Sequence, residues 1–428
     1  MAEQQTEPLD DCLEVLLDYR GKSPPKSRMG IPVLSAKVVK STGLLRPIEQ
    51  MIAPDYYSTW MVRGLPRPGD IVMTTEAPMG EVIQLDHETA QFALGQRIVC
   101  MRGKENKLDN TFLRYLLTSP MQQSILARYA TGTTVLGISQ KALRSVPITF
   151  PAFPHQQLIG SLLGALDDKI DLNRRMNATL EATARAIFKD WFVDFGPTRA
   201  KLEGRAPYLA LDIWSLFPDT LDEDGRPDGW NVGVLSDVAG LNPESWSRAT
   251  YPEAVDYVDL SNTKWGTIEA VTPYASEAAP SRAQRILRPG DTIVGTVRPG
   301  NGSYAYVSAQ GLTGSTGFAV LRPKNRIFRE VVYLAASARE NIDRLAHLAD
   351  GGAYPAVRPE LVATTELVAA PERLFAAFSS TTSALIERAE ANKREISTLA
   401  TTRDFLIPKL MSGELRVREA EKAIKVAV

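Results

Sequence analysis

Three charged residues have the spacing of a metal-dependent nuclease site. Asp86, Glu105 and Lys107 fit the loose pattern Asp…Glu-x-Lys that such nucleases use. A charged turn over residues 104–109 would account for the same residues equally well. A nuclease that cleaves DNA by itself in the presence of Mg²⁺ is therefore one alternative.

Other catalytic motifs are incomplete. Gly21-Lys22-Ser23 resembles the end of a phosphate-binding loop, but Leu16 stands where that loop needs its first glycine. Asn242-Pro243 is followed by Glu244, whereas amino-methyltransferases hold a flipped base with Asn-Pro-Pro-aromatic. The 2 cysteines and 3 histidines are too few and too dispersed for a disulfide framework or a zinc site. We therefore expect no catalytic residue and no bound metal or cofactor in this chain.

Positive charge is concentrated in two segments that are rich in turn-forming residues. Seven basic residues and no acidic one lie from Arg20 to Arg46, and four arginines accompany one aspartate from Arg282 to Arg298. Such loops suit duplex phosphates, because Lys and Arg release counterions and small residues allow close approach. A run of like charge is also typical of a plain solvated surface, but its presence in both halves of the chain favours nucleic acid.

Two loops in each half are predicted to read bases. The first spans residues 74–80 and 295–304, and the second spans 129–141 and 350–358. Arg298 has donors for the two acceptors of guanine, and Asn301 can pair with adenine. Tight turns with satisfied hydroxyls are the alternative interpretation. The predicted DNA-binding residues are Arg20, Lys22, Lys26, Arg28, Lys37, Lys40, Thr74, Thr75, Thr133, Thr134, Ser139, Lys141, Lys264, Arg282, Arg298, Asn301, Tyr304, Tyr354 and Arg358.

The elements that would position these loops occur twice in the chain. Arg67-Pro68-Gly69-Asp70 recurs as Arg288-Pro289-Gly290-Asp291, an offset of 221 residues. Leu34-Ser35 matches Leu260-Ser261 at an offset of 226, and residues 161–180 match 380–399 at an offset of 219. Offsets that drift so little indicate a duplicated domain-plus-helix module rather than a solenoid.

Each half ends in a segment of helical periodicity. Small or apolar residues recur at steps of three and four from Ile159 to Trp191 and from Phe378 to Leu410. This seam predicts two long helices in a coiled coil, the first about 60 Å long at 1.5 Å per residue. Asn173 and Asn392 hold equivalent positions, where a buried pair would fix the register and an exposed pair would not.

Length and composition describe a globular α+β protein of two or three domains. The 428 residues include 49 basic and 50 acidic side chains, which argues against a histone-like protein. The polar, acidic N-terminus and the lack of a long apolar run predict a cytoplasmic protein without a membrane contact. The predicted regions are two similar mixed α/β domains (1–154 and 230–370), two long helices (155–196 and 371–416), a linker (197–229) and a tail (417–428).

The chain resembles the specificity subunits of type I restriction–modification systems over nearly its whole length. Several motifs together carry the resemblance. They are Gly30-Ile31-Pro32-Val33-Leu34-Ser35-Ala36, the Arg-Pro-Gly-Asp strand, Gly132-Thr133-Thr134 continuing to Pro151, Ile187-Phe188-Lys189-Asp190-Trp191-Phe192-Val193-Asp194-Phe195, Gly225-Arg226-Pro227-Asp228-Gly229-Trp230 and Leu406-Ile407-Pro408-Lys409-Leu410-Met411-Ser412-Gly413-Glu414-Leu415. The aromatic block and the last motif are the most specific.

This resemblance implies two target-recognition domains, each reading half of a split, asymmetric double-stranded DNA site. It implies two antiparallel helices that hold the domains apart, and a pseudo-twofold repeat. Two methyltransferase subunits would bring S-adenosylmethionine, and restriction subunits would bring ATP and Mg²⁺. The predicted partner-binding residues are Phe188, Trp191, Phe192, Phe195, Leu410 and Met411. A coiled-coil scaffold without a DNA role is the remaining alternative.

Overall fold

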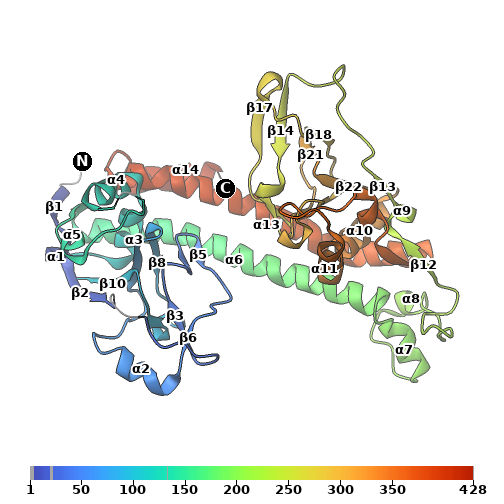
Figure 1. The fold of residues 1–428 in the computed structure, drawn as a ribbon, viewed down its shortest axis with the longest axis horizontal. Helices are drawn as coiled ribbons and strands as arrows, with labels where there is room; N and C mark the ends of the chain where they lie inside the picture. The colour runs from blue at the N-terminus through green and yellow to red at the C-terminus, as the bar shows by residue number, and fades with distance from the viewer. Residues whose placement is uncertain (1–3, 20–22, 133, 428) are drawn as a thin grey trace. The chain divides into compact units, whose positions relative to one another are not determined.

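The computed structural model describes residues 4–19, 23–132 and 134–427, and it divides into two compact units (Figure 1). Unit 1 comprises residues 1–172 and 395–428, and unit 2 comprises residues 173–394. The long helices α6 (Phe153–Phe192) and α13 (Glu372–Met411) are each divided between the units. Neither helix therefore belongs to one compact unit alone.

Unit 1 is built on an antiparallel sheet in the order β2-β10-β7-β8. A ribbon of β1 and β11, a small sheet β6-β3-β9 and the hairpin β4-β5 surround it. Its strands are β1 (Gln4–Pro8), β2 (Leu13–Asp18), β3 (Ile31–Leu34), β4 (Val39–Lys40), β5 (Gly43–Leu44), β6 (Met51–Ile52), β7 (Ile71–Thr75), β8 (Met79–Gln84), β9 (Ala93–Leu94), β10 (Ile98–Gly103) and β11 (Pro147–Pro151). Its shorter helices are α1 (Leu9–Cys12), α2 (Pro54–Trp60), α3 (Asn110–Thr118), α4 (Pro120–Tyr129), α5 (Gln140–Arg144) and α14 (Val417–Ala427).

Unit 2 repeats this plan with the sheet β13-β22-β19-β20 and the ribbon β12-β23. A second sheet, β17-β14-β21-β18, and the hairpin β15-β16 complete it. Its strands are β12 (Asn231–Val234), β13 (Ala239–Leu241), β14 (Ala254–Val258), β15 (Thr263–Lys264), β16 (Thr267–Ile268), β17 (Thr272–Ala275), β18 (Ala283–Ile286), β19 (Thr292–Gly295), β20 (Tyr304–Tyr306), β21 (Leu312–Ser315), β22 (Phe318–Pro323) and β23 (Glu366–Ala369). Its shorter helices are α7 (Gly196–Leu202), α8 (Leu211–Trp214), α9 (Leu235–Val238), α10 (Arg329–Ala336), α11 (Arg339–Leu348) and α12 (Pro359–Ala363).

The central strands carry apolar residues on both faces because each central sheet lies between two cores. In β7, Ile71 and Met73 pack into one core of unit 1 and Val72 packs into the other. In β19, Val294 and Ile293 divide between the two cores of unit 2 in the same way. Successive side chains of a strand point to opposite faces, so a sheet covered on both faces needs apolar residues without alternation.

The paired segments of α6 and α13 run antiparallel within each unit. In unit 1, Asp167 contacts Arg403, and two residues later Lys169 pairs with Glu395. In unit 2, Asn177 accepts a hydrogen bond of 2.8 Å from Asn392, and both side chains are buried. The predicted seam position of Asn392 is therefore confirmed as buried, but its hydrogen-bond partner is Asn177.

Two rings of the aromatic block at the end of α6, those of Trp191 and Phe192, lie in a core. Trp191 packs edge-on against Phe217 of the linker with ring centroids 5.3 Å apart, and Phe192 stacks on Phe375 of α13 at 5.3 Å. Trp230, the first residue of the second domain, lies against Phe192 as well. These rings join both long helices and the linker inside unit 2.

The segment predicted as a tail is the helix α14, and Ala420 on it is fully buried in a core of unit 1. Among the described residues, no helix combines the length and the apolar character needed to span a bilayer.

Candidate nucleic-acid interface

The repeated Arg-Pro-Gly-Asp motif makes the turn that starts a central strand. In unit 1 the Asp70 carboxylate accepts a hydrogen bond from the Arg67 N–H at 2.8 Å, and Gly69 has a φ of 90°. In unit 2 Asp291 accepts from the Arg288 N–H at 2.8 Å, and Gly290 has a φ of 96°. Glycine is needed at the third position because this left-handed backbone region disfavours other residues.

The same aspartate then binds an arginine on the neighbouring strand. Arg102 Nε and Nη2 donate to the two Asp70 carboxylate oxygens at 2.7 and 2.8 Å, and both residues are buried. Arg322 forms the corresponding pair with Asp291 at 2.9 Å for both bonds. A bidentate arginine–carboxylate pair fixes orientation as well as distance.

A glutamate on a third strand, or just beyond it, completes each network. Glu14 lies 3.4 Å from Arg102 and 3.9 Å from Arg67. In unit 2, Glu244 accepts hydrogen bonds from Arg288 at 2.6 and 2.8 Å and from Arg322, and these bonds lower the pKa of Glu244 to about 2. We call each set of four residues a strand frame: Glu14, Arg67, Asp70 and Arg102 in unit 1, and Glu244, Arg288, Asp291 and Arg322 in unit 2.

The frames position two loops that meet in each unit. In unit 1, Glu76 after β7 bridges to Gly137, and the Ile138 N–H donates to the Thr75 carbonyl at 3.0 Å. We call residues 74–80 and 129–139 the first loop pair. In unit 2, Val297 bridges to Ala356, and the Val357 N–H donates to the Thr296 carbonyl at 2.9 Å. Residues 295–304 and 350–358 are the second loop pair.

Most predicted DNA-binding residues lie on the surface. Lys26, Arg28 and Lys37 are exposed in the basic segment, and Lys40 is half-buried. The other exposed residues are Thr134, Ser139, Lys141, Lys264, Arg282, Arg298, Asn301, Tyr354 and Arg358. Arg20, Lys22 and Thr133 lie outside the described residues.

An open cleft of about 610 Å³ in unit 1 brings parts of this set together. Lys37 and Lys40 line it with Ala77 of the first loop pair and with Arg97. Arg97 was not predicted, although its carbonyl accepts from the Thr75 N–H at 2.8 Å. The equivalent acceptor in unit 2 is the Gly317 carbonyl, which bonds to the Thr296 N–H. The two units therefore share this backbone hydrogen bond, but only unit 1 has a charged side chain, that of Arg97, at the acceptor residue.

Three predicted DNA contacts need correction because their side chains are buried. Thr74 and Thr75 lie inside β7, and the Thr74 hydroxyl accepts from the Glu81 N–H at 2.9 Å. Tyr304 is 6% exposed and packs edge-on against Trp265. These residues shape the loop pairs from within and present no side chain to a duplex.

The predicted partner contacts also need correction. Trp191, Phe192, Leu410 and Met411 are each less than 5% exposed and belong to the two cores. Phe188 and Phe195 are half-buried and line a groove of about 670 Å³ in unit 2. Val193 and Val232, which are 53% and 58% exposed, line the same groove.

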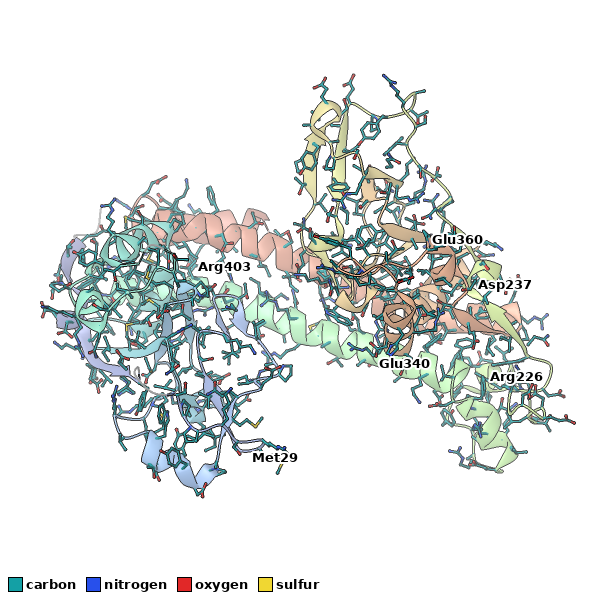
Figure 2. The ribbon with its side chains drawn as sticks, in the orientation of Figure 1. Met29, Arg226, Asp237, Glu340, Glu360 and Arg403 are labelled. Atoms are coloured by element: carbon teal, nitrogen blue, oxygen red, sulfur yellow. The ribbon has the colours of Figure 1, made fainter. Side chains whose placement is uncertain are left out.

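Two exposed side chains, one in the basic segment and one against the second loop pair, were not predicted by the sequence analysis. Met29, labelled in Figure 2, is 80% exposed between Arg28 and Gly30. Trp265 is 45% exposed and carries the Arg339 guanidinium 5.2 Å from its ring centroid. Exposed apolar and aromatic groups beside cations can contact thymine methyl groups or stack on bases. Solvent exposure alone distinguishes Met29 and Trp265 from other apolar residues, and the spacing of residues in the sequence does not predict exposure.

The residues of the nuclease alternative have other partners. Asp86 accepts hydrogen bonds from the Thr89 N–H and hydroxyl at 2.7 Å each, which closes a turn. Lys107 pairs with Glu7 at 2.6 Å. Within the described ranges, no group of three or more His, Cys, Asp or Glu side chains is placed to hold a metal ion. The structure therefore gives this alternative no support.

The chain is similar to known proteins both in sequence and in fold. Residues 26–182 match the family model of the type I restriction modification DNA specificity domain. The specificity subunit of the type I restriction enzyme MjaIX from Methanocaldococcus jannaschii is 24% identical over 359 residues, which cover 82% of this chain and 78% of that protein. The specificity subunit of HindI from Haemophilus influenzae is 24% identical over 403 residues, covering 82% and 87%.

This confirms the predicted resemblance to type I specificity subunits. A crystal structure of a type I S subunit from M. genitalium has the same fold, with a TM-score of 0.59 at 15% identity over 96% of each chain. The predicted α+β fold with two domains is thereby confirmed as well. The match to the family model ends at residue 182, so the second strand frame lies outside it.

Proposed function

We propose that this chain is the DNA-specificity subunit of a type I restriction–modification complex. Each unit binds one half of a bipartite, asymmetric site in double-stranded DNA through its loop pair. The chain itself performs no chemistry and binds no cofactor. Two methyltransferase subunits supply S-adenosylmethionine, and restriction subunits supply ATP and Mg²⁺.

One observation carries the proposal: the two strand frames have the same residue types, whereas the loops that they support have different ones. The two strand frames consist of the same residue types in the same places. The ion pair of Asp70 with Arg102 in the first frame corresponds to that of Asp291 with Arg322 in the second. The loops that they position do not repeat, since Ala77 in the first pair corresponds to Arg298 in the second, and both have positive φ. A repeated support with different loops suits two readers of different base sequences.

Charge and exposure support the DNA ligand. The cationic cleft in unit 1 and the arginines of the second loop pair are open to solvent. Phosphate contacts by Lys and Arg would position the duplex, and the loop side chains would reach base edges. Partner docking is assigned to the groove lined by Phe188, Val193 and Phe195, because these members of the aromatic block remain accessible.

A domain exchange tests the two-reader model. Residues 230–370 are replaced by the corresponding segment of a relative with a different site, and the chain is purified with its methyltransferase subunits. Binding to duplex libraries should show a change in one half of the site only, with affinity falling steeply as salt rises. Unchanged specificity would refute the model, and sequence-independent binding by the unexchanged complex would refute the proposed function.

A further inference from the structure

In the second loop pair, Arg298 from one loop lies over the ring of Tyr354 from the other. The guanidinium carbon is 4.7 Å from the ring centroid, and Nη2 donates to the Ala353 carbonyl at 2.7 Å. Tyr354 is 71% exposed, and Arg298 is also exposed. An arginine that stacks on an aromatic face loses rotational freedom without losing its charge.

The backbone of Arg298 is held as firmly as its side chain. Its N–H donates to the Pro355 carbonyl at 2.7 Å, next to the bridge between Val297 and Ala356. Its φ is 48°, in the left-handed region, and the short helical turn Pro299–Asn301 follows directly. The guanidinium is therefore fixed from both loops at once.

Most of the hydrogen-bonding capacity of Arg298 remains unused. A guanidinium has five N–H donors, and the bond to Ala353 uses one of them. Some other exposed cations are paired with carboxylates: Lys37 with Glu49, Lys264 with Glu269 and Arg339 with Asp343. No carboxylate of the described chain pairs with Arg298 within ion-pair distance.

We propose that Arg298 reads a guanine in the half of the site bound by unit 2, and that Tyr354 is a positioning residue that orients its guanidinium. Guanine presents N7 and O6 side by side in the major groove, and a planar fork of N–H donors matches both acceptors. A guanidinium fork can also bind a phosphate through two hydrogen bonds, but a phosphate contact does not depend on the base, and so binding to duplexes with different bases separates the two contacts. This proposal rests on the proposed DNA function and deepens it.

The test uses the full chain bound to its methyltransferase subunits. The probes are duplexes that carry the recognised site with each of the four bases at every position. Arg298→Ala should abolish the preference for guanine at one position of one half-site, a loss of about ten- to a hundredfold in affinity for the guanine duplex. Arg298→Lys should lose most of the same discrimination although the charge is kept.

The role of Tyr354 is measured by a double-mutant cycle at that position. Tyr354→Leu should reduce the guanine preference by about two- to fivefold, and Tyr354→Phe should retain it because the ring remains. In the Arg298→Ala background, Tyr354→Leu should have no further effect. Both side chains are exposed, so the thermal unfolding midpoints of the variants should equal that of the parent chain.

Two results would overturn the inference while leaving the proposed function intact. If Arg298→Ala lowers the affinity for every duplex by the same factor, Arg298 contacts a phosphate and not a base. An equal effect of Tyr354→Leu with and without Arg298 would show that the tyrosine acts on DNA independently. If the parent complex has no sequence preference at all, the proposed function fails first.

Discussion

At the scale of single residues, the Arg-Pro-Gly-Asp motif has a structural role that its sequence does not display. Its aspartate is buried and neutralised by an arginine that lies about thirty residues later, Arg102 after Asp70. Burying a carboxylate is expensive unless it is paired and hydrogen-bonded, so the pair is required once the strand lies between two cores. The sequence did hold one sign of this pair, because an arginine follows the motif at a similar distance in both halves, as Arg102 and as Arg322.

Removing the buried carboxylate should destabilise unit 1 strongly. Asp70→Ala leaves Arg102 buried without its bidentate partner, and we expect a loss of about 3–5 kcal/mol in the free energy of unfolding. Urea denaturation followed by circular dichroism measures it. Glu49→Gln is the matched control, because the Glu49–Lys37 pair is exposed to solvent and should contribute little to stability. Equal losses for both variants would contradict the assigned role of the frame.

The second frame should show a pH dependence that comes from Glu244. Hydrogen bonds from Arg288 and Arg322 lower its pKa from 4.5 to about 2. A carboxyl group whose folded-state pKa is lowered contributes stability that is complete above its unfolded pKa and is lost as the pH falls toward the folded value. Between about pH 4.5 and pH 2, the urea midpoint of the parent chain should therefore fall more steeply than that of Glu244→Gln. Parallel slopes for the two chains would contradict this.

At the scale of elements, periodicity predicted the long helices and also located their ends closely. The predicted segments 155–196 and 371–416 correspond to helices over Phe153–Phe192 and Glu372–Met411. The first helix ends sooner because Phe195 has a left-handed φ of 54° ahead of Gly196-Pro197, which starts α7. The resemblance implied that the aromatic block binds a partner, but the linker covers Trp191 and α13 covers Phe192. Periodicity alone cannot show which other element of the same chain packs against a helix.

Adjacent residues of the aromatic block should therefore respond differently to substitution. Trp191→Ala removes a side chain that is 1% exposed and should cost about 3–5 kcal/mol in the free energy of unfolding. Val193→Asp lies on the exposed wall of the groove and should change that free energy by less than about 0.5 kcal/mol. Val193→Asp should instead reduce co-purification with the methyltransferase subunit, because it places a charge in an apolar contact.

The control for this pair is Leu158→Asp, which is 54% exposed on α6 within unit 1 and does not line the groove. It should affect neither stability nor assembly. Normal co-purification of Val193→Asp would remove the groove from the proposed docking surface.

At the scale of the whole molecule, the repeat in the sequence predicted two domains of one plan, and the structure has two sheets of matching strand order. The candidate interface was predicted less well. Loop position follows from the repeat, which placed Arg298 and Tyr354 on two separate loops, and the structure brings these two residues into contact. Exposure depends on packing from distant segments, which explains why Thr74, Thr75 and Tyr304 were misjudged and why Arg97 was missed.

The division of the long helices has a consequence for the order of folding during synthesis. Unit 2 is a continuous stretch of chain, whereas the core that holds Phe112 and Leu163 also needs Leu399, Leu406 and Leu410. A ribosome that adds roughly 5–20 residues per second needs roughly 10–40 seconds to translate the segment between the two parts of unit 1. The half of the protein that is made first is therefore the last to close its core, and until then one apolar face of α6 stays open to chaperones and to aggregation.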